Sequence, residues 1–475
     1  MEPEIQFHAI HEKTKMTNLD LLFSFKGRIG RAPFWVYYLF WNLVFICLAL
    51  LAFSMSGKFL LTFAAIYMLV TLYPTLAVNI KRCHDRGRSG WFMLVSLVPI
   101  VSFWYLAEVG FLPGESGENE YGAESSLDLS EVFVGPQGLR AGWSAAILFL
   151  LTLLFMAVLG TLATAIAKPA HDANPNLLTP KTGLIVELIQ FFALLGAGTV
   201  VAYIERRRIL DYNLTGPRCF VHFLSGLAAG FVALSVLVGA MNWGGWLHFG
   251  PVTLTGAQIF GFAAIWGVIF LLTGLFEEGG FRCYLQCILT RGINFWWAAG
   301  AIGLVCLLLA LLVKGNCVWG VYAIALLGLF PCLMLHIRNT PRSGFWQAAW
   351  VTSTFFGLIH ITNNGENWIG IFAAALIGFV FCVSVRLTGT AWWAIGCHAS
   401  WNWAESYFYG TPDSGMVVTG HYMSSTPSGN VLWSGGTDGP EGSLLVLGAI
   451  LLLLTALLVI YGRKSAAALA APVAD

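Results

Sequence analysis

Charged side chains are scarce in this sequence. Asp, Glu, Lys and Arg make up only 10% of its 475 residues, whereas soluble domains carry about a quarter. Hydrophobic residues make up 57%, and long apolar runs recur along most of the chain. A run of about 18 residues or more can cross a hydrocarbon layer about 30 Å thick as a helix. The composition therefore excludes a water-soluble enzyme and predicts an all-α, polytopic transmembrane helical bundle.

Other features are missing as well. Neither charge sign prevails, with 25 basic against 24 acidic residues, so nothing favours binding to nucleic acid. The ten cysteines form no CxxC pair and no zinc-type spacing, so no disulfide framework is indicated. The first twenty residues are rich in charge and have no apolar core. They are therefore not a signal peptide, and we expect the N-terminus in the cytosol.

The hydrophobic segments, about 12 or 13 by length and composition, fall into two membrane units. We expect the first unit at residues 1–112 and the second at residues 142–475. Residues 113–141 carry six acids before the first base, at Arg140, and show no apolar period, so they are predicted to be an acidic linker.

The Lys and Arg clusters in short loops mark the cytosolic side of the membrane. All of them lie in the cytosol only if the run at 91–112, which Pro99 interrupts, re-enters the membrane instead of crossing it. The same alternation of spans places the Gly- and Ser-rich loop 410–442 on the extracytosolic side.

Ionisable groups inside a span are costly unless they face a cavity or a partner, so they mark candidate functional sites. The first group, Glu277, Glu278 and Arg282, follows the apolar run 257–276. Glu278 and Arg282 are four residues apart and share one helix face, whereas Glu277 points about 100° away. The ion pair thus leaves the Glu277 carboxylate free for chemistry.

The other groups are His360, late in an apolar run, and the pair His398 and Asn402, which share one helix face. Taken singly, each is more often a packed or structural residue than a catalyst. Together with Glu277 they form the minimum set for hydrolysing an amide. Glu277 is the predicted base, and a neutral His398 with the Asn402 carboxamide is the predicted oxyanion donor. His360 is predicted to orient the water or share its proton.

A metal site is the alternative for the same residues. Glu277, His360 and His398 match the donor types of a catalytic zinc site with one open position. The sequence has no HExxH motif, and the three residues come from separate segments, so their spacing neither supports nor excludes zinc. We expect no cofactor and keep zinc as the minority alternative.

These groups resemble a known set of motifs on successive hydrophobic segments. In chain order the motifs are Glu277-Glu278-x-x-x-Arg282, Phe356-x-x-x-His360 and His398-x-x-x-Asn402. They resemble the three motifs of the CPBP intramembrane proteases, a family that includes the CAAX prenyl endopeptidase and bacterial relatives linked to bacteriocin self-immunity. The resemblance covers about residues 180–462.

The CPBP resemblance implies a CAAX-type intramembrane glutamic endopeptidase. It assigns water activation to Glu277 and His360, the oxyanion site to His398 and Asn402, and a supporting role to Glu278 and Arg282. It also implies a membrane-associated protein or peptide as substrate. The alternative function is a non-catalytic membrane-binding or bacteriocin-immunity-type protein, which keeps the polar residues only as an interhelical network.

The N-terminal part resembles a second family. The segments that carry this likeness are Phe23-Ser-Phe-Lys-Gly-Arg-Ile-Gly-Arg31, Lys81-Arg-Cys-His-Asp-Arg-Gly-Arg-Ser-Gly-Trp91 and Pro113-Gly-x-x-Gly-x-Asn-x-Tyr-Gly122. They resemble the small bacterial membrane proteins grouped as domain of unknown function 805, over about residues 18–123. The resemblance implies a bacterial cytoplasmic membrane. The basic loop is expected to lie near anionic membrane lipid.

Overall fold

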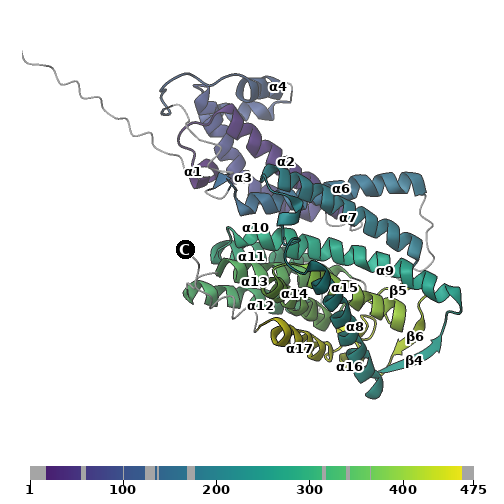
Figure 1. The fold of residues 1–475 in the computed structure, drawn as a ribbon. Coiled ribbons are helices and arrows are strands. Elements are labelled where there is room, and N and C mark those ends of the chain that lie inside the picture. Colours follow the sequence, from purple (N-terminus) through teal and green to yellow (C-terminus); the bar gives the residue numbers. More distant parts are fainter. Residues whose placement is uncertain are drawn as a thin grey trace, which may run out of the picture. The chain divides into compact units, whose positions relative to one another are not determined.

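The protein is described by a computed structural model that covers residues 18–54, 60–99, 101–123, 134–135, 138–167, 177–312, 317–338, 343–363 and 365–462. The chain divides into two compact units, Met1–Gly138 and Leu139–Asp475, which follow one another along the colour bar of Figure 1. The predicted cytosolic N-terminus at residues 1–17, and residues 124–133 of the predicted linker, lie outside the described residues.

Helices dominate both units, which confirms the predicted polytopic helical bundle. Seven helices in the described part are long and apolar enough to cross a membrane. Their spans are Ala64–Asp85, Ala141–Ile166, Pro180–Ile204, Cys219–Trp243, Ala257–Thr290, Gly320–Arg338 and Trp368–Thr388. The protein is thus a multi-pass membrane protein.

The first unit is built on a pair of packed helices, α2 (Arg31–Ser54) and α3 (Leu60–Asp85), with the short α1 (Asn18–Phe23) against α3. The apolar run predicted to re-enter the membrane does not form one helix. It consists of a 3₁₀ segment (Gly90–Leu97), α4 (Val101–Leu106) and a π turn (Ala107–Phe111), and none of these pieces has the length of a span.

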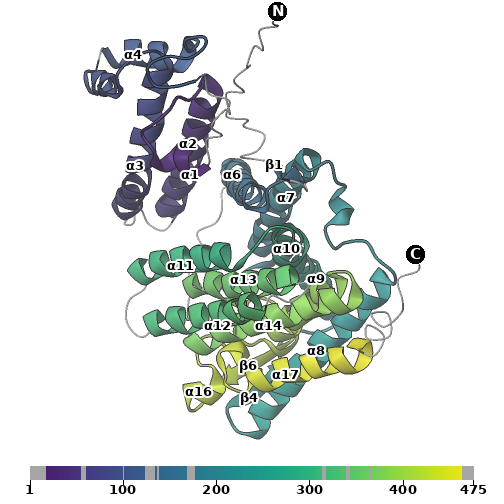
Figure 2. The same cartoon turned by 90° about the vertical axis from the view of Figure 1, so that its left-hand side faces the viewer.

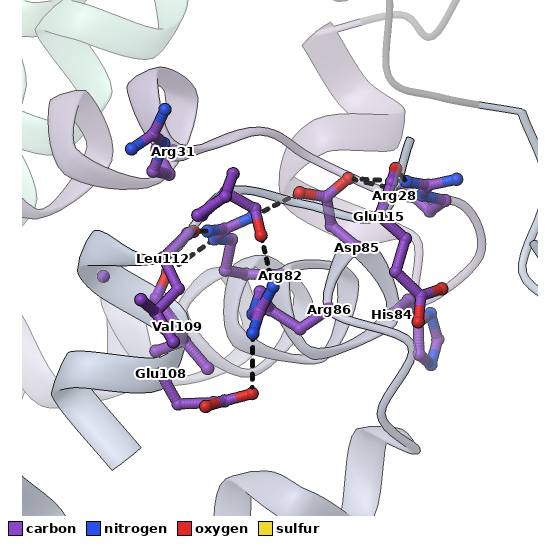
Figure 3. A network of polar contacts seen from close by, with 12 residues as sticks. Arg28, Arg31, Arg82, His84, Asp85, Arg86, Glu108, Val109, Leu112 and Glu115 are labelled. Carbon is purple, nitrogen blue, oxygen red and sulfur yellow. Dashed lines mark hydrogen bonds and ion pairs between the residues drawn. The ribbon is translucent and has the colours of Figure 1, made fainter. Parts of the chain in front are cut away.

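Buried arginines hold the first unit together (Figure 3). The side chains of Arg28 and Arg82, with exposed fractions of 1% and 0%, both pair with Asp85 at the end of α3. Arg28 also donates to the carbonyls of Glu115 and Gly117, at 2.5 and 2.6 Å. Part of the predicted linker is therefore folded onto α3. These two arginines serve the interior of the unit and do not face lipid.

The second unit contains the remaining helices (Figures 1 and 2). Its helices are α6 (Ala141–Ala167), α7 (Pro180–Ile204), α8 (Cys219–Trp243), α9 (Ala257–Glu278), α10 (Gln286–Thr290), α11 (Phe295–Leu312), α12 (Cys317–Arg338), α13 (Ser343–Ile359), α14 (Trp368–Thr388), α15 (Trp392–Asn402), α16 (Val431–Ser434) and α17 (Val446–Leu457). Along one side, α11, α12, α13 and α14 pack successively on one another, and α17 packs on α8 and α14.

Helix α15 packs closely between α8, α9 and α14. Small residues allow this close packing, since a Cβ atom at Gly226 or Gly230 of α8 would collide with the backbone carbonyls of α15. Likewise, a Cβ at Gly396 of α15 would meet the α8 backbone, and Gly274 of α9 lies against the backbone of α15. The side chains of α15 are consequently held in fixed positions relative to α9.

The loop 410–442 is folded over one end of this helical layer. Its strand β6 (Met423–Pro427) pairs antiparallel with β4 (Leu247–Val252), and its strand β5 (Val417–Val418) pairs in parallel with β3 (Leu177–Leu178). These short pairings fix the loop to the segments that precede α7 and α9.

Candidate active site

One cavity of about 540 Å³ lies among the helices of the second unit. Glu277, His360, His398 and Asn402 all line it. Much of its wall is apolar, and side chains from α7, α9, α14 and α17 supply that wall. The structure thus brings together four polar residues that are up to 125 positions apart in the sequence.

Glu277 and Glu278 stand at the point where α9 passes into a π turn, Gly279–Leu285. Glu278 is completely buried, and its Oε2 lies 3.1 Å from Nε of the equally buried Arg282. The Glu277 side chain is 22% exposed and faces the cavity. The two neighbouring carboxylates therefore have different environments, one paired inside the protein and one open to a ligand. π turns inside helices are frequent at functional sites.

The Arg282 guanidinium is surrounded by aromatic rings. Its Cζ lies 4.3 Å from the ring centroid of Phe356, and the rings of Phe281 and Phe381 follow at 5.6 Å each. A contact of this kind with a desolvated cation contributes about 2 kcal/mol or more. A Cβ at Gly378 would collide with the guanidinium, so this glycine leaves the space that Arg282 fills.

His398 lies between the two glutamates. Its Nδ1 is 2.9 Å from Glu278 Oε1, and its Nε2 is 3.9 Å from Glu277 Oε2. The imidazole also stacks near the ring of Phe381 at a centroid distance of 6.1 Å. Since a carboxylate only accepts hydrogen bonds, Nδ1 carries a hydrogen and donates a hydrogen bond to Glu278. Glu278 thereby orients the imidazole toward Glu277.

His360 follows the last turn of α13, and its Nδ1 lies 2.6 Å from the carbonyl oxygen of Phe356. Because a carbonyl accepts, Nδ1 is the donor and Nε2 of the neutral ring remains an acceptor. The rings of His360 and His398 lie 4.9 and 6.2 Å from the Phe356 ring, measured between centroids. Phe356 therefore packs against both imidazoles. Asn402 is the last residue of α15, directly before a second π turn, Trp403–Tyr409.

A different group of carboxylates has oxygens close enough together to share a metal ion. Within the described residues, the three ligand atoms that lie within 4.8 Å of one another belong to Glu405, Asp413 and Glu441. The three residues of the minority zinc alternative do not form such a group in this part of the chain.

Several acids of the cavity were not identified from the sequence. Glu187 of α7 and, from the loops, Glu366, Asp413 and Glu441 line the cavity together with Glu277, and no Lys or Arg is among its described lining residues. Glu187 stands alone in a long apolar run, which is itself a signal of function in a membrane protein. The loop acids carry no comparable signal, because acidic residues are ordinary in loops.

Burial and neighbouring carboxylates raise the pKa values of two acids in the loops, Glu366 and Asp438. Burial raises the pKa of Glu366, and the neighbouring carboxylates of Asp438 and Glu441 raise it further. Burial likewise raises the pKa of Asp438, whose Oδ2 accepts from the backbone N–H of Asn367 at 3.3 Å. At this end of the cavity, the protonated and neutral form of these carboxyl groups is therefore favoured.

Comparison with known proteins identifies the family of the first unit. Residues 22–123 match the family described as "Protein of unknown function (DUF805)". Uncharacterized protein YiiR of Escherichia coli (strain K12) is 37% identical over 23% of this chain and 91% of its own length. Through this unit, the chain belongs to the DUF805 family. Inner membrane protein YhaH of the same strain is 30% identical over 22% of this chain and 89% of its own length. The Arg28–Asp85 network lies inside the DUF805 match.

A second match falls in the other unit. Residues 332–404 match the family described as "Type II CAAX prenyl endopeptidase Rce1-like". His360, His398 and Asn402 lie within the matched stretch, and Glu277 lies outside it. Both resemblances expected from the sequence are thus confirmed, and the second supports a CAAX-type intramembrane protease at the family level. No solved structure matches the protein.

Proposed function

We propose that the second unit is an intramembrane endopeptidase in which Glu277 activates water for attack on a peptide bond. The observation that carries this proposal is that Glu277, His360, His398 and Asn402 line the same cavity among apolar helices. A carboxylate with an open face in such a cavity can take a proton from water. The Rce1-like match supports the same class of reaction. The substrate is a membrane-associated protein or peptide that reaches the site from the lipid.

The first step requires a base and a second group that orients the water. Glu277 accepts a proton while the water oxygen forms a bond to the peptide carbonyl carbon. His360 orients the water through Nε2, which is an acceptor because Nδ1 donates to the Phe356 carbonyl. These two side chains enter the cavity from α9 and from the end of α13.

The second step requires donors for the oxyanion. A neutral His398 that donates through Nδ1 to Glu278 has only a lone pair on Nε2, so it cannot donate there, contrary to the role expected from the sequence. We propose that Nε2 takes the proton that Glu277 has removed from the water. The resulting imidazolium and the Asn402 NH₂ then stabilise the oxyanion. When the C–N bond breaks, the leaving nitrogen takes up this proton.

Hydrolysis can be tested on purified protein in lipid nanodiscs with membrane-embedded reporter peptides. In water labelled with ¹⁸O, we expect each new carboxyl terminus to carry one labelled oxygen. Activity should persist in 1,10-phenanthroline, which removes zinc and leaves alkaline-earth cations in place. Loss of activity in phenanthroline with recovery on adding Zn²⁺ would support the zinc alternative. Absence of cleavage across a broad peptide set would support the non-catalytic binder.

Asn402→Ala tests the donor role. An oxyanion donor acts mainly in the transition state, so kcat should fall by about 10²- to 10³-fold while KM changes little. Asn402→Asp keeps the size of the side chain and replaces its NH₂ donor by an acceptor, so it should lose at least as much activity. Steady-state kinetics on one reporter peptide measures both parameters. A rise in KM at unchanged kcat would instead assign Asn402 to substrate binding.

A further inference from the structure

Three carboxylates converge just beyond the end of α15. Glu405 lies in the π turn that follows Asn402, Asp413 lies at the start of the folded loop, and Glu441 lies in a 3₁₀ turn before α17. One oxygen from each comes within 4.8 Å of the other two. Asp413 and Glu441 also line the cavity, so the group can be reached from it.

Among the described residues, no Lys, Arg or His forms an ion pair with Glu405. Its side chain is completely buried, and neither carboxylate oxygen has a hydrogen-bond partner in the described part of the chain. The nearby donors serve its neighbours instead. The Trp401 indole N–H donates to Glu441 at 2.8 Å, and the Ser406 hydroxyl donates to Asp413 at 2.9 Å. Burying an unpaired carboxylate costs several kcal/mol, so a cation bound between Glu405 and the two neighbouring acids would stabilise all three.

The donor set identifies the kind of cation. All three side chains offer oxygen ligands, and the group contains neither His nor Cys. Hard divalent cations prefer such ligands. Oxygens on opposite sides of Ca²⁺ are about 4.6–5.2 Å apart, whereas around Mg²⁺ they are about 4.0–4.2 Å apart. The three oxygens lie within 4.8 Å of one another, so a single Ca²⁺ ion can contact all three.

We propose that Glu405, Asp413 and Glu441 form a binding site for one Ca²⁺ ion. The ion links the loop 410–442 to the helical segment that carries His398 and Asn402. It therefore fixes the loop over the cavity. The loop is expected on the extracytosolic side, where Ca²⁺ is abundant and extracellular sites bind it with Kd values of about 10⁻⁴–10⁻³ M. The site does not depend on the proposed peptidase activity.

Terbium(III) is a suitable probe, because it replaces Ca²⁺ and its luminescence is sensitised by a nearby tryptophan. Here that residue is Trp401, whose indole N–H donates a hydrogen bond to Glu441. We expect full-length protein, stripped of metal and held in nanodiscs, to bind one Tb³⁺ per chain, and Ca²⁺ to displace it. Ca²⁺ should also raise the midpoint of thermal unfolding. Failure of the wild-type protein to bind Tb³⁺ or Ca²⁺ saturably would overturn the proposal, whatever the variants do.

Variants assign the binding to these residues. Glu405→Gln and Asp413→Asn each remove one negative ligand and should weaken Ca²⁺ binding about tenfold or more, because affinity follows the number of charged ligands. The matched control is Asp211→Asn, which removes an acid that pairs with Arg208 in an exposed turn of the same unit. It should leave binding unchanged. Equal affinity in the wild type and in both ligand variants would exclude this site.

Discussion

Glu277→Gln is expected to abolish cleavage while leaving the protein folded in the membrane. Glutamine keeps the shape of the side chain but cannot take a proton from water, so turnover should fall by about 10³-fold or more. The structural cost should be small, because Glu277 faces the cavity and its Oε2 has no hydrogen-bond partner among the described residues. Single-turnover rates on a reporter peptide, measured beside the thermal midpoint, separate the two effects.

The matched control for this variant is again Asp211→Asn, an acid-to-amide change at a residue that does not line the cavity. It should cleave at the wild-type rate. If Glu277→Gln keeps the wild-type rate as well, then Glu277 is not the base and the non-catalytic alternative gains support. The proposed Ca²⁺ site is unaffected by either result, since it is tested by measuring metal binding and not turnover.

The local geometry of the glutamate motif could be predicted from the sequence. A spacing of four residues sets Glu278 beside Arg282 on any helix, and the two side chains lie 3.1 Å apart. The end of the helix could not be predicted in this way. The apolar run stops at residue 276 because charged residues follow it, yet the helical segment continues through a π turn to Thr290, as a span of 34 residues from Ala257. Glu277 therefore lies well inside the span.

The continued helix explains why the depths that the sequence predicts for Glu277 and His360 do not agree. Simple alternation of spans puts Glu277 near the end of one span and His360 late in a span of opposite direction, at different depths. In the structure both line the same cavity. Position along an apolar run is thus a poor measure of depth when a π turn lets a helix continue past charged residues. Here Glu278 pairs with Arg282 inside the bundle and Glu277 faces a cavity, so the charges do not have to lie at the membrane surface.

The partners of His398 depend on tertiary packing, which no spacing rule captures. Its two carboxylate neighbours lie 120 and 121 residues earlier in the chain, and its position depends on close contacts of Gly226, Gly230 and Gly274 with the backbone of α15. Glu405 was within reach of sequence reasoning, since it is an acid in the largely apolar stretch 391–408 and such acids are usually functional. Its partners in the loop were not.

The largest effect on stability is expected from Glu278→Leu. This change leaves the Arg282 guanidinium completely buried without its carboxylate, and it also removes the acceptor of His398 Nδ1. Breaking a buried ion pair from one side costs about 3–5 kcal/mol. We therefore expect a strongly lowered thermal midpoint and little folded protein in the membrane, in contrast to Glu277→Gln, where only catalysis is lost.

The double variant Glu278→Leu/Arg282→Met separates charge from shape. It removes both buried charges and keeps apolar volume among the rings of Phe281, Phe356 and Phe381, so much of the lost stability should return. Activity should not return, because His398 still lacks the carboxylate that orients it toward Glu277. A folded but inactive double variant would assign Glu278 to positioning His398 as well as to balancing Arg282. Recovery of both stability and turnover would limit its role to charge balance.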